Sequence, residues 1–228
     1  MIKKLSLILL VVVIICAFAG CKNTGTKVST TDPPQQLDKI ESATEEILDN
    51  IAANDWMAAQ SKVSEIESDF TKVKPKLKKA KIATDTINGL SNAIKGLSTA
   101  VSAEMSYDAR AEANKIFKFL PDVYDHYKNT VPTDLGRLNY LGHEIILNAE
   151  KYEWDAATTN CYTALELWGD LKTELKADYN NDVASFQNTI DDLQRAVESK
   201  DAAAVTKQAG TLLDQVVVLE RDFLEQSK

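Results

Sequence analysis

The sequence predicts an all-α protein made of two tandem four-helix units, each an up-down antiparallel bundle. Apolar residues recur at intervals of three and four along most of the chain, which is the spacing of one buried helix face. Only 8 glycines and 5 prolines interrupt the 228 residues, and no stretch alternates apolar and polar residues as a half-buried strand does. The body of the chain also matches itself at a fixed offset, which indicates an internal duplication.

The first 20 residues have the features of an export signal. A lysine pair precedes an apolar run over 5–19, which has signal-peptide length and is too short for a membrane-spanning helix. The run ends in small residues directly before Cys21 and resembles the lipobox of bacterial lipoproteins, although Phe18 stands where that family usually has Leu. The resemblance implies that the signal peptide 1–20 is removed and that the thiol of Cys21 carries fatty acyl chains, palmitate among them.

This interpretation places the chain at the extracytoplasmic face of a cell membrane, held there through Cys21. Residues 21–31 are polar and predict a flexible tether. Loss of residues 1–20 leaves 24 basic and 34 acidic residues, a net charge of −10, which disfavours nucleic acid as a partner. The expected partners are the membrane itself and an envelope protein or cell-wall polymer.

The first unit is expected over 32–128, with a linker near 129–133 and the second unit over 134–228. Pro121 is expected to kink the fourth helix. Apolar stripes predict four helices in the first unit, running from Leu37 to Ile51, from Trp56 to Leu77, from Ile87 to Val101 and from Ala109 to Tyr127. The expected helix caps and starts are Asp32 ahead of two prolines, Asn54 or Asp55, Ser106, and in the second unit Asp134 and Asp201.

The evidence for duplication is a shared Trp-x-Ala-Ala sequence that begins at Trp56 and again 98 residues later at Trp154. After a two-residue deletion the offset becomes 96. One continuous array of helices packed through the Trp-bearing helices is an alternative to two separate bundles. Further matches include Leu37 with Leu135, Ile47 with Ile145, Phe70 with Trp168, Lys74 with Lys172, Leu90 with Phe186 and Ile94 with Ile190.

The duplication gives an internal control for candidate functional residues. Cys161 is the one cysteine left in the body of the mature chain, and its counterpart Val63 is aliphatic. We therefore expect a buried small side chain and not a nucleophile. Trp56 and Trp154 each begin an apolar stripe, which favours a core role over a ligand-stacking one.

The dipeptide His143-Glu144 is the best candidate for a metal site, because helical bundles host Glu and His ligands in their cores. A duplicated, exported bundle resembles the imelysin-like proteins, which carry a Gly-x-His-x-x-Glu motif. Here His143 follows Gly142 directly, and Ile146 stands where that motif has Glu. The resemblance implies an alternative function as a metal- or small-ligand-binding lipoprotein associated with uptake; the residues themselves predict no metal or other cofactor.

A lysine-rich stretch is a second candidate site. The matching segment of the second unit, 170–179, is mixed in charge, so the fold does not require these cations. A solvated helix end, whose cations complement the helix dipole, is one interpretation, and contact with an anionic envelope polymer or with membrane headgroups is the other. The stretch comprises Lys72, Lys74, Lys76, Lys78, Lys79 and Lys81.

No arrangement of residues predicts an enzyme: there is no Ser/His/Asp signature, no glycine-rich phosphate loop and no Cys-x-x-Cys pair. A Trp-initiated helix with a Lys-Pro-Lys end resembles small helical envelope proteins of unknown function from Gram-positive bacteria. We therefore expect a non-enzymatic, membrane-anchored module that binds or scaffolds another envelope component.

Overall fold

The computed structural model describes residues 31–227, and every regular element in that range is a helix. The all-α prediction is confirmed. The expected signal peptide, Cys21 and all of the tether but its last residue lie outside the described residues, and no described helix has the length and apolarity needed to cross a membrane. The elements are α1 (Gln35–Ala52), α2 (Trp56–Lys79), α3 (Thr84–Ser102), α4 (Ser106–Tyr124), α5 (Thr133–Glu150), α6 (Trp154–Leu171), the 3₁₀ helix η1 (Ala177–Tyr179), α7 (Asn180–Glu198) and α8 (Ala202–Gln226).

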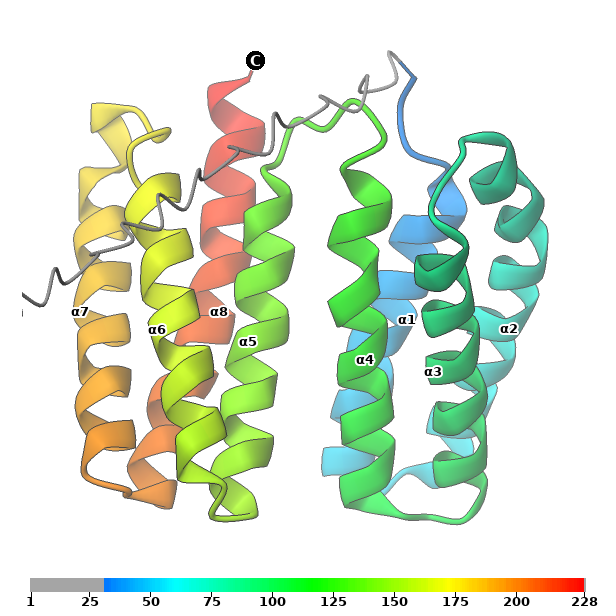
Figure 1. Ribbon diagram of the computed structural model, residues 1–228, viewed down its shortest axis with the longest axis horizontal. Helices are drawn as coiled ribbons and strands as arrows, with labels where there is room; N and C mark the ends of the chain where they lie inside the picture. Colours follow the sequence, from blue (N-terminus) through cyan, green and yellow to red (C-terminus); the bar gives the residue numbers. More distant parts are fainter. Residues whose placement is uncertain (1–30, 228) are drawn as a thin grey trace, which may run out of the picture.

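The helices form two four-helix bundles that stand side by side with their axes nearly parallel (Figure 1). Successive helices pack against each other within α1–α4 and within α5–α8, and each set closes on itself through the α1–α4 and α5–α8 contacts. The main contact between the bundles is between α4 and α5. The alternative array packed through the Trp-bearing helices, α2 and α6, is therefore wrong.

Each bundle has its own hydrophobic core, and the predicted stripes form it. Leu37, Ile40 and Ile47 of α1 are fully buried in the first core, and Leu135, Leu138 and Ile145 of α5 are fully buried in the second. Burial of one such aliphatic side chain contributes about 1.5–3 kcal/mol relative to exposure. Trp56 and Trp154 pack against these cores and stay partly exposed, so their predicted core role is only partly right.

Four turns of only three residues join the helix pairs at one end of the molecule (Figure 1). Each has a non-glycine residue in the left-handed region, at Asn54, Glu104, Tyr152 and Lys200, with φ between 54° and 59°. In each turn, the residue that follows this one donates its backbone N–H to the carbonyl five residues before it, as in a Schellman motif. Tyr152 follows Asn54 by 98 residues and Lys200 follows Glu104 by 96, which are the offsets of the sequence alignment; common descent of the two halves stays a prediction.

Two of the predicted caps are confirmed. The carboxylate Oδ1 of Asp55 accepts a hydrogen bond from the Ala58 N–H at 3.0 Å, at the start of α2. That of Asp201 accepts from the Ala204 N–H at 3.0 Å, at the start of α8. These bonds satisfy one of the free donors that every helix N-terminus has.

The other three predicted starts are wrong. Asp32 does not cap α1, because it and Pro33 each precede a proline, which disfavours helical backbone, and Pro34 takes the cap position in an extended conformation. Pro132 takes the cap position of α5, which begins at Thr133 and not at Asp134. The connection between the two bundles is therefore 125–132. Ser106 is the first residue of α4, because the turn places Met105 at the cap.

We expect Asp55→Ala and Asp201→Ala each to lower the free energy of unfolding by about 1 kcal/mol, since a cap hydrogen bond is lost. Thermal unfolding followed by circular dichroism measures the effect. Ser106→Ala is the control and should leave the melting temperature nearly unchanged. A loss at Ser106 as large as at Asp55 would contradict the cap assignments.

Candidate functional site

The predicted pair His143 and Glu144 lies in the seam between the bundles, where α5 packs on α4. The ring of His143 stacks on Phe117, with centroids 5.6 Å apart and an angle of 14° between the planes. Glu144 Oε2 accepts a hydrogen bond from Nδ2 of the buried Asn114 at 2.7 Å. Burial, with a smaller contribution from Arg110, lowers the pKa of His143 to about 4. At neutral pH the imidazole is therefore uncharged and packed against an aromatic ring.

Two ion pairs also cross the seam. Arg137 of α5 pairs with Asp122 of α4 at 3.1 Å. The guanidinium of Arg110 on α4 binds both carboxylate oxygens of Glu150 at the end of α5, at 2.8 and 2.5 Å. Two parallel hydrogen bonds between charged groups restrict orientation as well as distance. Within residues 31–227 no group of three or more His, Cys, Asp or Glu side chains is placed to hold a metal ion. The contacts of His143 and Glu144 are thus those of an interface between two bundles.

Cys161 is 1% exposed and lies in the core of the second bundle. Burial is the main cause that raises its thiol pKa, to about 11. The thiolate is the reactive form, so this environment suits a packing residue. The sequence interpretation of Cys161 as a buried small side chain agrees with this position.

The predicted lysine stretch lies in the last turns of α2 and the turn after it. Its lysines contact different partners and do not form a single cluster. Lys72 pairs with Asp69 at 2.9 Å, and Lys76 donates to Gln36 of α1 at 2.8 Å. Lys74 lies over the ring of Phe70, with its Nζ 5.4 Å from the centroid.

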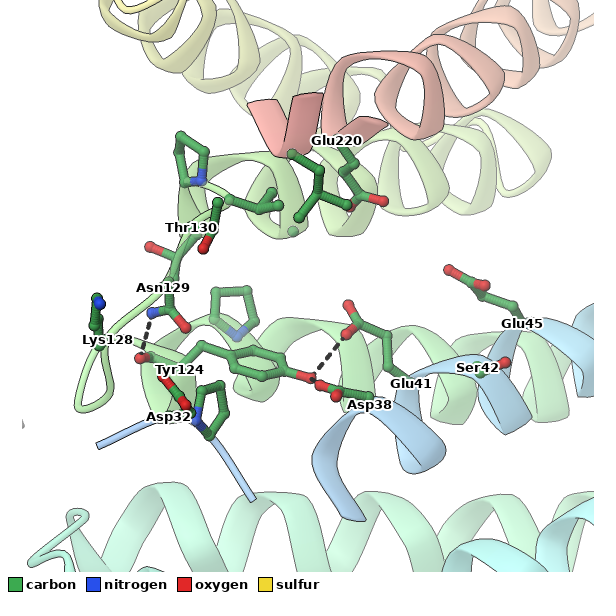
Figure 2. Close-up of a pocket in the computed structure, with 17 residues that line it drawn as sticks. Asp32, Asp38, Glu41, Ser42, Glu45, Tyr124, Lys128, Asn129, Thr130 and Glu220 are labelled. Carbon is green, nitrogen blue, oxygen red and sulfur yellow. Dashed lines mark hydrogen bonds between the residues drawn. The ribbon is translucent and has the colours of Figure 1, made fainter. Parts of the chain in front are cut away.

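A pocket of about 600 Å³ opens between the bundles, with Asp32 among its lining residues (Figure 2). Its size is within the range of small-molecule sites. Apolar and carboxylate side chains line it together, from α1, the end of α4, the 125–132 connection, α5 and α8. The lining residues are Asp32, Pro33, Asp38, Glu41, Ser42, Glu45, Pro121, Tyr124, Lys128, Asn129, Thr130, Val131, Pro132, Thr133, Gly136, Glu220 and Leu224.

A close approach of α4 and α5 forms one wall of this pocket. Gly136 on α5 faces Pro121 on α4, and a Cβ at Gly136 would come within 3.1 Å of the proline ring. The absence of a side chain there lets the two backbones pack closely at the pocket end of the seam. On the other side, Glu41 and Glu45 of α1 and Glu220 of α8 point into the same space from different bundles (Figure 2).

The hydroxyl of Tyr124 links two carboxyl groups in the pocket. It lies 2.8 Å from Asp38 Oδ1 and 3.0 Å from Glu41 Oε2. A phenol has one proton to donate, so it satisfies both neighbours only when one of them is itself protonated. For both contacts to be hydrogen bonds, one of the two carboxyl groups must therefore carry a proton.

The electrostatics of the pocket favour a proton on Glu41, although the hydrogen bond from Tyr124 by itself lowers the pKa of this group. Burial and then the charge of Glu220 raise the pKa of Glu41 to about 8. Burial and the charge of Glu45 raise the pKa of Glu220 to about 7. Burial and the neighbouring Asp49 and Glu46 also raise the pKa of Glu45. Five carboxyl groups and one ammonium group, that of Lys128, line the pocket, so acidic groups outnumber basic ones.

Sequence reasoning missed this pocket. Glu41 and Glu220 are at opposite ends of the chain and meet only because the seam sets α1 and α8 on the same side of the molecule. Only one feature of the sequence pointed to it. Glu41 and Glu45 are one helical turn apart and sit beside the apolar stripe of α1, where a second surface could cover them.

We expect the protein to lose stability as pH rises from about 6.5 to 8. The raised pKa of Glu41 means that the folded chain holds a proton above its ordinary pKa of 4.5, which the unfolded chain has released, so the free energy of unfolding falls through this window. Glu41→Gln should raise the melting temperature at pH 8 and flatten the pH profile. Glu166→Gln, at an exposed position on α6, is the control.

The lowered pKa of His143 acts in the opposite direction. The unfolded chain takes up its proton first, so below about pH 6.5 His143 lowers stability as pH drops and opposes the contribution of Glu41. A profile that Glu41→Gln leaves unchanged between pH 5 and 8 would contradict the protonation of Glu41.

No protein-family model matches this chain. The searches for similar curated proteins and for similar solved structures also found no match.

Proposed function

We propose that this chain is a non-enzymatic, membrane-anchored binding module on the extracytoplasmic face, which holds a positively charged group of another envelope component between its two bundles. The observation that carries the proposal is the pocket where Glu41 and Glu220 converge from different bundles with raised pKa values. Carboxyl groups whose pKa values are raised by burial and by one another are stabilised as anions when a cation enters.

The ligand class follows from the walls of the pocket. Pro33, Pro121, Val131 and Leu224 supply apolar surface beside the carboxylates. A bare metal ion would leave that surface unused, whereas an alkylammonium group, such as a lysine side chain or a small amine, has a charged head and an apolar stem. Metal uptake, the alternative drawn from His143 and Glu144, gains no support from their contacts with Phe117 and Asn114.

The proposed location fits the position of the pocket in the fold. Asp32 and Pro33 line it, so the chain enters the fold at the pocket itself. With acyl chains on Cys21, the ten residues that follow would reach about 35 Å at full extension. A partner at or near the membrane surface is therefore within reach of the pocket.

Titration of the detergent-solubilised full-length chain with cadaverine tests the pocket. We expect calorimetry to show binding that strengthens between pH 6 and 8, by up to about tenfold per pH unit for each proton displaced. The double variant Glu41→Gln, Glu220→Gln should lose this binding, and Glu166→Gln should keep it. Equal affinity in the double variant, or affinity that is independent of pH, would refute the pocket as the site.

The membrane anchor has its own test, which is Cys21→Ser. We expect the variant to leave the membrane fraction on cell fractionation, because the thiol that would carry the acyl chains is gone. Thr24→Ala, a substitution a few residues farther along the expected tether, is the control and should stay with the membrane. Retention of the Cys21→Ser variant at the wild-type level would rule out lipid anchoring through this residue.

A further inference from the structure

A second concave site lies on the outer side of the first bundle, in a groove of about 450 Å³ between α2 and α3. These two helices pack within the first bundle and form no main contact with the second. Phe70 and Ile94 give the groove an apolar floor, and the hydroxyl of Ser91 lines it. Three ammonium groups, those of Lys74, Lys78 and Lys95, line it beside a single carboxylate, Glu67.

The second bundle shows how the matching place can be filled. Offsets of 98 and 96 pair Phe70 with Trp168, Lys74 with Lys172, Ser91 with Gln187 and Lys95 with Asp191. There, Gln187 Oε1 accepts from Trp168 Nε1 at 2.9 Å and from Lys172 Nζ at 3.0 Å, and Gln187 Nε2 donates to Asp191 at 2.9 Å. One amide thus occupies the site and bonds to the lysine, the indole and the carboxylate.

The first bundle keeps the lysine of that network and lacks its other members. Phe70 has no N–H, Ser91 is too short to act as Gln187 does, and Lys95 places a cation where the second bundle has Asp191. Among the described residues, no ion pair joins Lys74, Lys78 or Lys95 to a carboxylate; the ion pairs of this region involve Lys72 and Lys62. The groove is therefore open and cationic in a chain whose net charge is −8.

We propose that this groove binds phosphate groups, supplied by a lipid headgroup or by a phosphate-linked polymer. Lysine ammonium groups bind phosphate as point charges, and a phosphate oxygen can also accept from the Ser91 hydroxyl. Two of the six lysines of the stretch, Lys74 and Lys78, belong to the site, and Lys95 of α3 joins them. The proposal does not depend on the amine pocket, which lies between the bundles.

Lysine acetylation read by mass spectrometry tests the groove on the full-length chain. The probes are inorganic tripolyphosphate in solution and vesicles of phosphatidylglycerol in phosphatidylcholine, with pure phosphatidylcholine vesicles as the reference. We expect Lys74, Lys78 and Lys95 to be protected severalfold more than Lys200 and Lys207. Protection by tripolyphosphate indicates a soluble phosphate source, and protection by phosphatidylglycerol alone indicates the lipid headgroup.

The matched variant is Ser91→Gln with Lys95→Asp, which installs the residues of the second bundle. Protection of Lys74 and Lys78 should disappear, and the dissociation constant for tripolyphosphate should rise by about tenfold or more, because contacts to a charged group are lost. Lys207→Asp on α8 makes the same change in net charge and should bind as wild type does. If the double variant does not fold, Lys78→Gln and Lys95→Gln replace it.

Protection that is uniform over the exposed lysines, or absent with both probes, would overturn the proposal. So would full protection in the Ser91→Gln, Lys95→Asp variant with an unchanged dissociation constant.

Discussion

The packing of α4 on α5 is the contact on which the rest of the arrangement depends. Each bundle has its own buried core and closes on itself, and the partly buried Tyr140 of α5 packs against both cores. The directional contacts of the seam include the Arg110–Glu150 and Arg137–Asp122 pairs, the Asn114–Glu144 hydrogen bond and the Phe117–His143 stack. Directional contacts of this kind set the relative orientation of two bodies more strictly than apolar contacts do.

The acidic pocket is a consequence of that orientation. Because α4 and α5 touch, α1 and α8 are brought to the same side without packing closely, and their carboxyl groups share one space (Figure 2). Any small rotation about the seam changes the distance between Glu41 and Glu220. The electrostatic repulsion between these two carboxyl groups therefore depends on the geometry of the interface.

Sequence reasoning succeeded where a local rule decides the outcome. The apolar stripes located the helices, and the caps Asp55 and Asp201 lie in short turns where an acidic side chain can reach a free N–H. It failed at Asp32, where two prolines moved the helix start. It did not identify Phe117 as the partner of His143, because that ring comes from another helix. It did not predict the pocket or the position of Lys95 beside the α2 lysines, because both depend on which helices lie side by side in space.

The even number of helices in each bundle has a geometric consequence. An up-down bundle of four helices returns the chain to the end at which it started, so residue 31, the 125–132 connection and the end of α8 all lie at one end of the molecule (Figure 1). Adding another such unit to the C-terminus would extend the protein sideways and leave its height unchanged. A chain of this design can grow wider by repetition while its height stays that of one bundle.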